Sequence, residues 1–290
     1  MSRMEQDAAN RALLRHGFTW NVVAFSSLAA TFQGYLFGLL GLDQRLLGVK
    51  VLPGLEDVPT ETANWLIMFG TIIGAACSGV LASRLGRRSA AVFAARVAVI
   101  ASALSALPRV SPILYLVGRA FSGTATGIFS AVVPMYQSEL APAATRGSIL
   151  VTYQLAYQLG GLSAYLVIRS ILLVPAITYV HGATEILFGM QGVPALFMAA
   201  VLPYLPESPR WHMLRGKFDE AKHELVRLRK GQTLVVLQEL QTMRSYARIR
   251  NACWLAVTTI KSTPIWLPAS TTCSLQLRHR LMAFLGTPRS

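Results

Sequence analysis

The chain is poor in charge and in the residues from which enzymes build reactive sites. Only 14% of its 290 residues are charged, with 13 acidic against 27 basic residues. The three cysteines (Cys77, Cys253 and Cys273) have neither metal-ligand spacing nor a disulfide framework. The histidines are scattered, and no nucleophile elbow, phosphate-binding loop or metal motif occurs. These absences argue against an enzyme, and no cofactor is expected.

Apolar residues, in contrast, are abundant. They make up 53% of the chain, and the mean hydropathy of +0.46 is well above that of an average globular protein. A net charge of +14 is compatible with a nucleic-acid partner. In so apolar a chain it instead indicates cytoplasmic loops at a membrane, where Lys and Arg concentrate. We therefore predict a multi-pass protein in a lipid bilayer, with no nucleic-acid partner.

Six apolar segments are long enough to span a bilayer, which takes about 20 residues each. They are Trp20–Leu42, Ala63–Ala82, Ala90–Leu107, Ile113–Tyr136, Ile149–Val174 and Ile186–Leu205. Basic residues gather in the connections after the second, fourth and sixth segments, which places the N-terminus in the cytoplasm. The sequence thus predicts an all-α, polytopic membrane helix bundle over residues 20–206, preceded by a cytoplasmic tail over residues 1–19.

The character of the chain changes at residue 207. Ser208 is a favourable N-cap, and Pro209 suits the first helical position. Further on, four apolar residues share one helical face: Phe218, Ala221, Leu225 and Leu228. We predict a cytoplasmic amphipathic helix within 207–231.

The last part of the chain, residues 232–290, lacks a sustained period and has no acidic residue after Glu239. Lys261, Pro264 and Pro268 break its apolar stretches, so no seventh span is predicted. We interpret it as an aberrant, disordered tail whose composition is typical of translated non-coding sequence.

Glycines occur in pairs four residues apart within three of the apolar segments. The pairs are Gly34 with Gly38, Gly70 with Gly74, and Gly123 with Gly127. Small residues at this spacing allow membrane helices to approach closely. The pairs predict tight contacts between helices.

The stretch from Gly118 to Gly161 holds charged and amide side chains within an apolar sequence, where they are costly and usually functional. In order and spacing it resembles the fourth and fifth transmembrane helices of the sugar-porter family, within the major facilitator superfamily. The matching positions are Gly118, Arg119, Gly123, Gly127, Pro134, Tyr136, Glu139, Pro142, Arg146, Gly147 and Gln154. Residues 79–88 and 206–211 resemble two cytoplasmic motifs of the same proteins.

The resemblance covers residues 21–229 and implies the N-terminal six-helix half of a major facilitator fold, built from two inverted three-helix repeats. It implies transport of a sugar or related polyol across the plasma membrane by alternating access, with or without protons as a second partner. Such transporters normally have twelve helices, so we expect this chain to need another transporter half and not to transport alone. The alternative is a non-transporting sugar sensor or an inactive fragment.

Gln154 lies eight residues after Arg146, the spacing of a family glutamine that hydrogen-bonds substrate hydroxyls. Gln158 follows one helical turn later on the same face. Amides suit sugars because they donate and accept without charge. The resemblance thus implies substrate binding by Gln154 and Gln158, and the alternative for both is hydrogen bonding between helices.

Arg119 lies in an apolar run and needs an acidic partner or water. The best candidate is Asp43, because residues 41–44 (GLDQ) resemble a helix-one motif of family members. Family proton symporters pair such an aspartate with the helix-four arginine, so the resemblance implies a proton-coupling pair. Two alternatives remain: Asp43 ends helix one at the outer surface, or helix one aligns through residues 37–40 and has no such aspartate.

The cytoplasmic motifs imply a charge network that latches the outward-facing state in the family. Ser83 stands where the family usually has an acidic residue, which removes one partner. The alternative is a set of solvated loop charges. The residues expected to form the network are Arg84, Arg88, Glu139, Arg146, Glu207 and Arg210.

Overall fold

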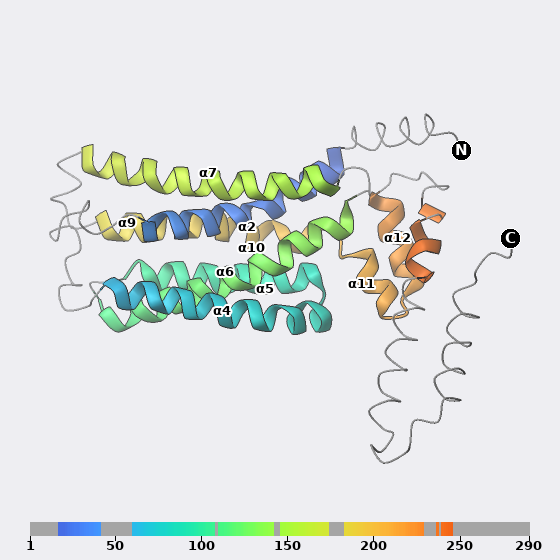
Figure 1. The fold of residues 1–290 in the computed structure, drawn as a ribbon, viewed down its shortest axis with the longest axis horizontal. Helices are drawn as coiled ribbons and strands as arrows, with labels where there is room; N and C mark the ends of the chain where they lie inside the picture. The colour runs from blue at the N-terminus through green and yellow to red at the C-terminus, as the bar shows by residue number, and fades with distance from the viewer. Residues whose placement is uncertain are drawn as a thin grey trace, which may run out of the picture. The chain divides into compact units, whose positions relative to one another are not determined.

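The computed structural model describes residues 17–41, 60–107, 110–141, 146–173, 183–228, 236–237 and 239–245. Within these ranges all regular structure is helical (Figure 1). The helices are α2 (Gly17–Gly41), α4 (Thr60–Leu85), α5 (Arg87–Ser105), α6 (Pro112–Leu140), α7 (Arg146–Leu173), α9 (Ala183–Gly189), α10 (Gly192–Val201), the 3₁₀ helix η1 (Leu202–Tyr204), α11 (Pro209–Leu214) and α12 (Phe218–Leu228).

The chain divides into two compact units, residues 1–240 and 241–290, and the helices named above belong to the first. Residues 236–237 and 239–245 of the predicted disordered tail are helical. The rest of that tail, most of the N-terminal tail and the predicted site residue Asp43 lie outside the described residues.

Five of the described helices are long and apolar enough to cross a membrane: Val22–Leu40, Glu61–Leu85, Arg87–Ser105, Pro112–Leu140 and Ile186–Tyr204. A helix satisfies its own backbone hydrogen bonds, as a membrane segment must. This confirms the all-α membrane bundle. The segment predicted at Ile149–Val174 forms α7, which has 28 residues but is not among the five. Its exposed side chains include Gln154, Gln158 and Arg169.

Two predicted helices are each divided in the structure. The sixth apolar segment, counted above as one span by its length and composition, is divided by a turn at Met190 and Gln191 into α9 and α10. The segment predicted to be a cytoplasmic helix is two helices, α11 and α12, separated by Gly216 with φ +77°. A positive φ strains any residue except glycine, which ends α11 here.

The ends and buried faces of α11 and α12 agree in part with those predicted from the sequence. Ser208 is the N-cap of α11 and Pro209 its first residue, but the Ser208 hydroxyl does not cap the helix. On α12, Ala221, Leu225 and Leu228 are buried as predicted. Phe218, expected on the same face, is 43% exposed.

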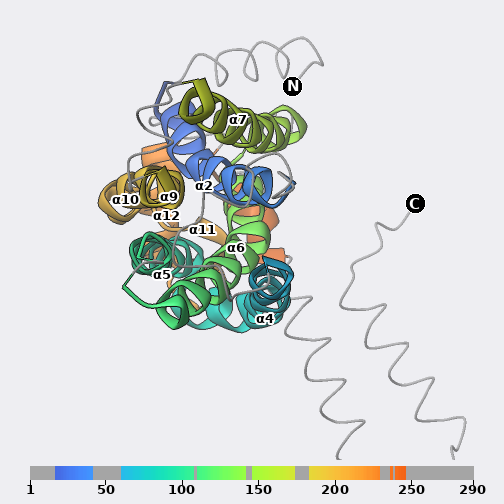
Figure 2. The ribbon, with the colours of Figure 1, turned by 90° about the vertical axis from the view of Figure 1, so that its left-hand side faces the viewer.

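The six long segments pack in a reciprocal pattern. Helices α4 and α5 both pack on α6, while α7 and α10 both pack on α2 (Figure 2). The two central helices, α2 and α6, also contact each other, as do α5 and α10. Each group of three consecutive segments thus places its second and third helices on the first helix of the other group. This arrangement is that of two interleaved three-helix repeats.

Glycines line the closest of these contacts, as the sequence predicted. A Cβ atom at Gly123 would overlap the Ile67 carbonyl group on α4. Likewise, a Cβ atom at Gly34 would overlap the Tyr157 carbonyl group on α7. The α4–α6 and α2–α7 seams therefore bring backbones together at a distance that only glycine permits.

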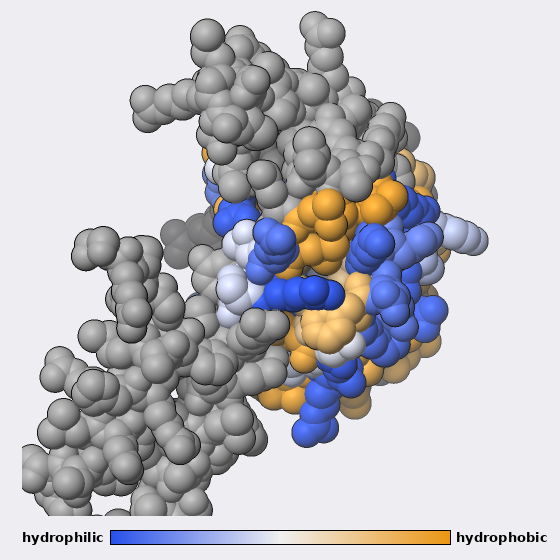
Figure 3. Space-filling view, turned by 90° about the vertical axis from the view of Figure 1, so that its right-hand side faces the viewer, coloured by the Kyte–Doolittle hydropathy of each residue, from blue (hydrophilic) through white to orange (hydrophobic). Residues whose placement is uncertain are grey.

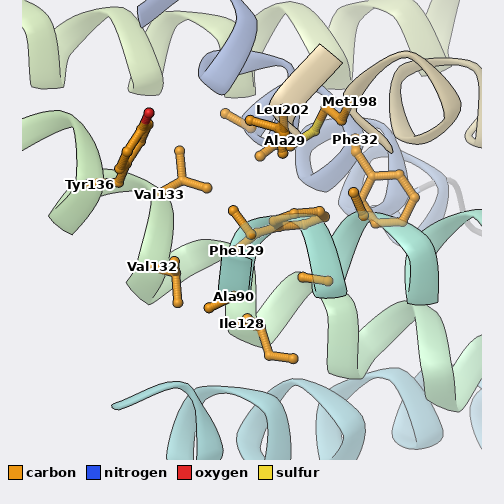
Figure 4. Close-up of a cluster of buried hydrophobic side chains, with 14 of the residues drawn as sticks. Ala29, Phe32, Ala90, Ile128, Phe129, Val132, Val133, Tyr136, Met198 and Leu202 are labelled. Carbon is orange, nitrogen blue, oxygen red and sulfur yellow. The ribbon is translucent and has the colours of Figure 1, made fainter. Parts of the chain in front are cut away.

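The apolar core lies where α2, α5, α6 and α10 meet (Figure 4). Phe32 and Phe129 cross edge to face, with ring centroids 6.0 Å apart. Met198 and Leu202 lie close to them, and the alanines of α5, including Ala90, let this helix approach α6. This core fixes the central helices on which the peripheral ones pack.

Candidate functional site

The exposed face of α7 presents the two amides singled out in the sequence. Gln154 and Gln158 are both exposed, whereas Tyr153 is buried against α2 and Tyr157 is half-buried. Leu155 and Leu159 are exposed next to the amides, so two groups that donate and accept hydrogen bonds stand among apolar side chains. A few polar groups on an apolar wall are typical of small-molecule sites. Contact with a substrate stays a prediction for both glutamines.

Arg119 is buried in the bundle, with 2% of its surface exposed. Its guanidinium carbon lies 5.1 Å from the ring centroid of Phe188 and 5.8 Å from that of Tyr115. Nε and Nη1 have no hydrogen-bond partner among the described residues. Aromatic faces attract a cation, but they do not replace hydrogen-bond acceptors. Asp43, the predicted partner, lies outside the described residues, so the pair stays a prediction.

A buried glutamine lies near Arg119, and the sequence analysis did not single it out. Gln191 sits at the turn between α9 and α10 and is fully buried. Its Nε2 donates to the hydroxyl of Ser122, which is one helical turn after Arg119 on α6. An amide in the middle of an apolar segment, between Gly189 and Gly192, was the available signal.

Glu139 makes the central contacts among the residues predicted to form a cytoplasmic charge network. It forms an ion pair with Arg87, Nη2 to Oε1 at 3.0 Å, and both side chains are 10% exposed. The Ser208 hydroxyl donates to the other carboxylate oxygen. Glu139 thereby joins α5, α6 and the start of α11. The sequence prediction named Arg84 and Arg88 but missed Arg87, the third arginine of the same motif.

Glu207 and Arg88 also come together, through a backbone contact. The Arg88 backbone N–H donates to Glu207 Oε1 at 2.9 Å, so this carboxylate caps the N-terminus of α5. The Arg88 guanidinium donates to the carbonyl oxygens of Pro203 and Leu205. Gly86, with φ +104°, lies directly under the carboxylate, where a Cβ atom would be 2.5 Å from Glu207 Oε2.

The other predicted network residues have weaker roles in the structure. Arg84 is exposed, and its carbonyl oxygen, not its guanidinium, accepts a hydrogen bond from Arg215. Arg146 Nε donates to the Ser138 carbonyl oxygen at 3.0 Å. Arg210 is half-buried, and its side chain has no ion pair or hydrogen bond with the part of the chain that is described.

The motif residue Ser83 contributes through its backbone. Its carbonyl oxygen accepts hydrogen bonds from Trp211 Nε1 at 3.0 Å and from Arg215 at 3.3 Å. Polar side chains therefore gather at the end of the bundle that carries α11 and α12 (Figure 3). They tie these helices to the ends of α4, α5 and α6.

Comparison with known protein families gives a direct match. The model of a family described as "Sugar (and other) transporter" matches residues 22–283. The chain belongs to this sugar transporter family. The resemblance inferred from the sequence is thereby confirmed.

Several curated members of the family are similar to the chain. The galactose-proton symporter of Escherichia coli K12 is 32% identical over 236 residues, which are 79% of this chain and 48% of that protein. The probable inositol transporter 2 of Arabidopsis thaliana is 32% identical over 226 residues, 75% of this chain and 37% of that protein. The chain spans about half the length of the curated relatives it matches.

Solved structures agree on the fold of this sugar transporter family member. The xylose transporter of E. coli in a partially occluded inward-open conformation matches with a TM-score of 0.71 and 25% identity. The match covers 83% of this chain and 62% of that one. A multi-pass membrane protein with a major facilitator fold is thus established for the chain.

Proposed function

We propose that these six helices form one half of a transporter that moves a sugar or related polyol across the plasma membrane by alternating access. The observation that carries the proposal is the exposed pair of amides on α7, Gln154 and Gln158, in a chain of the sugar transporter family. A second six-helix half would face them and close the substrate path. Transport, and not chemical conversion of the sugar, is then the activity.

In this proposal the amides bind the hydroxyl groups of the sugar. Each amide offers a carbonyl oxygen and two N–H donors, which match a hydroxyl that both donates and accepts. The apolar side chains around them, Leu155 and Leu159 among them, contact the sugar ring and exclude water. The affinity for the sugar falls when the two transporter halves separate on one side of the membrane.

Proton coupling rests on Arg119 and Asp43. The ionised Asp43 carboxylate would accept hydrogen bonds from Arg119, whose Nε and Nη1 atoms have no partner among the described residues. Protonation of Asp43 removes its charge and releases the arginine, which changes the relative stability of the two access states. Similarity to proton symporters, such as the galactose-proton symporter, supports proton coupling. It also favours a transporter over a non-transporting sensor.

The cytoplasmic network would stabilise the outward-facing state in the same scheme. The pairs Glu139–Arg87 and Glu207–Arg88 hold the ends of α5 and α6 to the segment that leads into α11. A second half would add its own polar groups to this end of the bundle. Opening toward the cytoplasm would then require these contacts to rearrange.

Substitution of Gln154 tests the substrate site. In a transporter completed with a C-terminal half, Gln154→Ala is expected to weaken sugar binding by about 1–3 kcal/mol, the scale of an unsatisfied polar partner. Leu173→Ala is the matched control, because Leu173 is exposed at the far end of the same helix and has no role in the proposed site. Equal affinity of Gln154→Ala and the parent in equilibrium binding would contradict the role.

Substitution of Asp43 tests proton coupling. Asp43→Asn in the same completed transporter is expected to abolish accumulation of sugar against its gradient and to leave sugar exchange intact. The neutral amide cannot release a proton, while it still offers Arg119 an acceptor. Proton-driven accumulation by the variant would show that Asp43 is not the coupling acid.

A further inference from the structure

The contact between α2 and α7 contains a chain of hydrogen bonds that crosses three helices. The Tyr153 hydroxyl on α7 donates to Gln33 Oε1 on α2 at 2.6 Å. Gln33 Nε2 in turn donates to the Thr126 carbonyl oxygen on α6 at 3.3 Å. Tyr153 is 9% and Gln33 is 6% exposed. A short bond between two buried side chains is both directional and costly to leave unmade.

The remainder of the α2–α7 contact is formed by glycines and backbone groups, with few interlocking side chains. Gly34 faces the Tyr157 carbonyl group, Gly38 faces Gly161, and Gly160 faces the Thr31 carbonyl group. Small residues allow two helices to approach closely, but they offer few shape features that prevent one helix from turning about its own axis. Within the described part of α7, the other side-chain bond to a neighbouring helix is that of Arg146, at the first residue.

The position of Tyr153 gives the bond a functional consequence. Tyr153 directly precedes Gln154, and Tyr157 directly precedes Gln158. Successive helical residues differ by about 100° around the axis, so the tyrosines turn toward α2 while the amides remain exposed. A rotation of α7 by a fraction of that angle would carry both amides away from their present direction.

We propose that Tyr153 and Gln33 are positioning residues: their hydrogen bond sets the rotation of α7 and thereby the direction of Gln154 and Gln158. Gln33 extends the constraint to α6 through Thr126. The effect on sugar binding rests on the proposed function, whereas the rotation of α7 does not. Neither residue touches the sugar in this scheme, and their effect passes through the two amides.

The test uses the full chain, purified in detergent, with its three cysteines replaced by alanine. A single reporter cysteine is placed at exposed Gln158 or at half-buried Ala156. The ratio of maleimide labelling rates at the two positions reports the rotation of α7. Tyr153→Phe, which removes only the hydroxyl, is expected to change this ratio by about two- to tenfold, the range that matches one net hydrogen bond.

Tyr157→Phe is the matched control. Tyr157 lies one turn further on the same helix, its ring packs near Phe37 with centroids 6.4 Å apart, and its hydroxyl bonds to none of the described residues. The Tyr157→Phe variant is expected to leave the ratio of labelling rates unchanged. Gln33→Met should reproduce the effect of Tyr153→Phe, and the double variant should add nothing further, because one bond is shared. If Tyr153→Phe does not fold, Gln33→Met carries the same test.

Sugar binding in the completed transporter provides the second readout. Tyr153→Phe is expected to weaken binding about two- to tenfold, and Tyr157→Phe to leave it unchanged. An unchanged labelling ratio in both Tyr153→Phe and Gln33→Met overturns the positioning role, whatever the sugar result. If the variants change the labelling ratio but the parent transporter itself binds no sugar, the positioning role is supported and the proposed function is overturned.

Discussion

Helices α4 and α7 hold equivalent places in the bundle but present different surfaces. Each packs along a central helix across a glycine seam, α4 on α6 and α7 on α2. The exposed face of α4 carries large apolar side chains, among them Trp65, Phe69 and Ile72. The exposed face of α7 alternates leucines with Gln154, Gln158 and Arg169.

The difference shows that packing role and surface chemistry are set by separate residues. Glycines and alanines on the inner faces bring the helices together, and they are similar in the two repeats. The outer faces are free to differ, because none of the described helices covers their exposed residues. The α4 surface is apolar, whereas the α7 surface carries the polar groups that the proposed substrate path would require.

The two repeats are also held differently at the end of the bundle that carries α11, and breaking the stronger contact should have the largest effect. Arg87→Met removes the partner of Glu139 and leaves a carboxylate that is 10% exposed without its cation. We expect a loss of about 3–5 kcal/mol in the free energy of unfolding, measured by denaturant titration in micelles. Arg84→Met, at an exposed arginine of the same motif, should cost little. Equal losses of unfolding free energy in Arg87→Met and Arg84→Met would mean that the Arg87–Glu139 ion pair adds no stability of its own.

A charge on the outer faces would test whether α4 and α7 meet different surroundings. Ile72→Arg puts a cation on the apolar face of α4, which should disfavour insertion by about 3 kcal/mol. Gln158→Arg on α7 should cost clearly less, because that face already carries polar groups. Protease protection of membrane-inserted chain measures both. A similar loss for the two variants would contradict the assigned difference.

Substitution in the seams should show where the two repeats are alike. Gly123→Ala and Gly34→Ala would each force a central helix away from its neighbour, and we expect each to cost about 2 kcal/mol in thermal unfolding. Gly79→Ala is the control, because no atom lies within 4 Å of a Cβ atom at Gly79. If only one seam tolerated alanine, the repeats would not be equivalent.

The smallest effect is expected at the start of α7. Arg146 is held by one hydrogen bond to the Ser138 carbonyl oxygen. Arg146→Met should therefore reduce the free energy of unfolding by only about 1 kcal/mol in the same titration. A loss as large as that of Arg87→Met would show that both repeats are anchored with equal strength.

The sequence predicted the helical segments and the family because both depend on long apolar runs and local spacing. It did not predict how each helix is rotated in the bundle. Where a helix is apolar on most sides, hydropathy does not distinguish its inner face from its outer face. The inward direction of Gln33 and Tyr153 was therefore not evident. Only the packed bundle shows which polar side chains face another helix.

For the predicted charge network, the sequence identified several of the residues that lie together but not the bonds between them. Glu139, Glu207 and Arg88 lie together, but the partner of Glu139 is Arg87, and Glu207 binds a backbone N–H group. The three arginines of the motif (Arg84, Arg87 and Arg88) have the same chemistry, and the turn at Gly86 separates the first from the other two. The turn at Met190 and Gln191 was missed for a related reason, since both residues are compatible with a continuous helix.

The cap on α5 also sets an order of events during synthesis. Glu207 follows Arg88, whose N–H group it accepts, by 119 residues. At about 5–20 residues per second, the ribosome needs about 6–24 s to travel that far. For that interval the first three-helix repeat exists with an open helix terminus and with Gly86 uncovered. Its completion depends on a residue made after the second repeat, so the two repeats mature as one unit and not in succession.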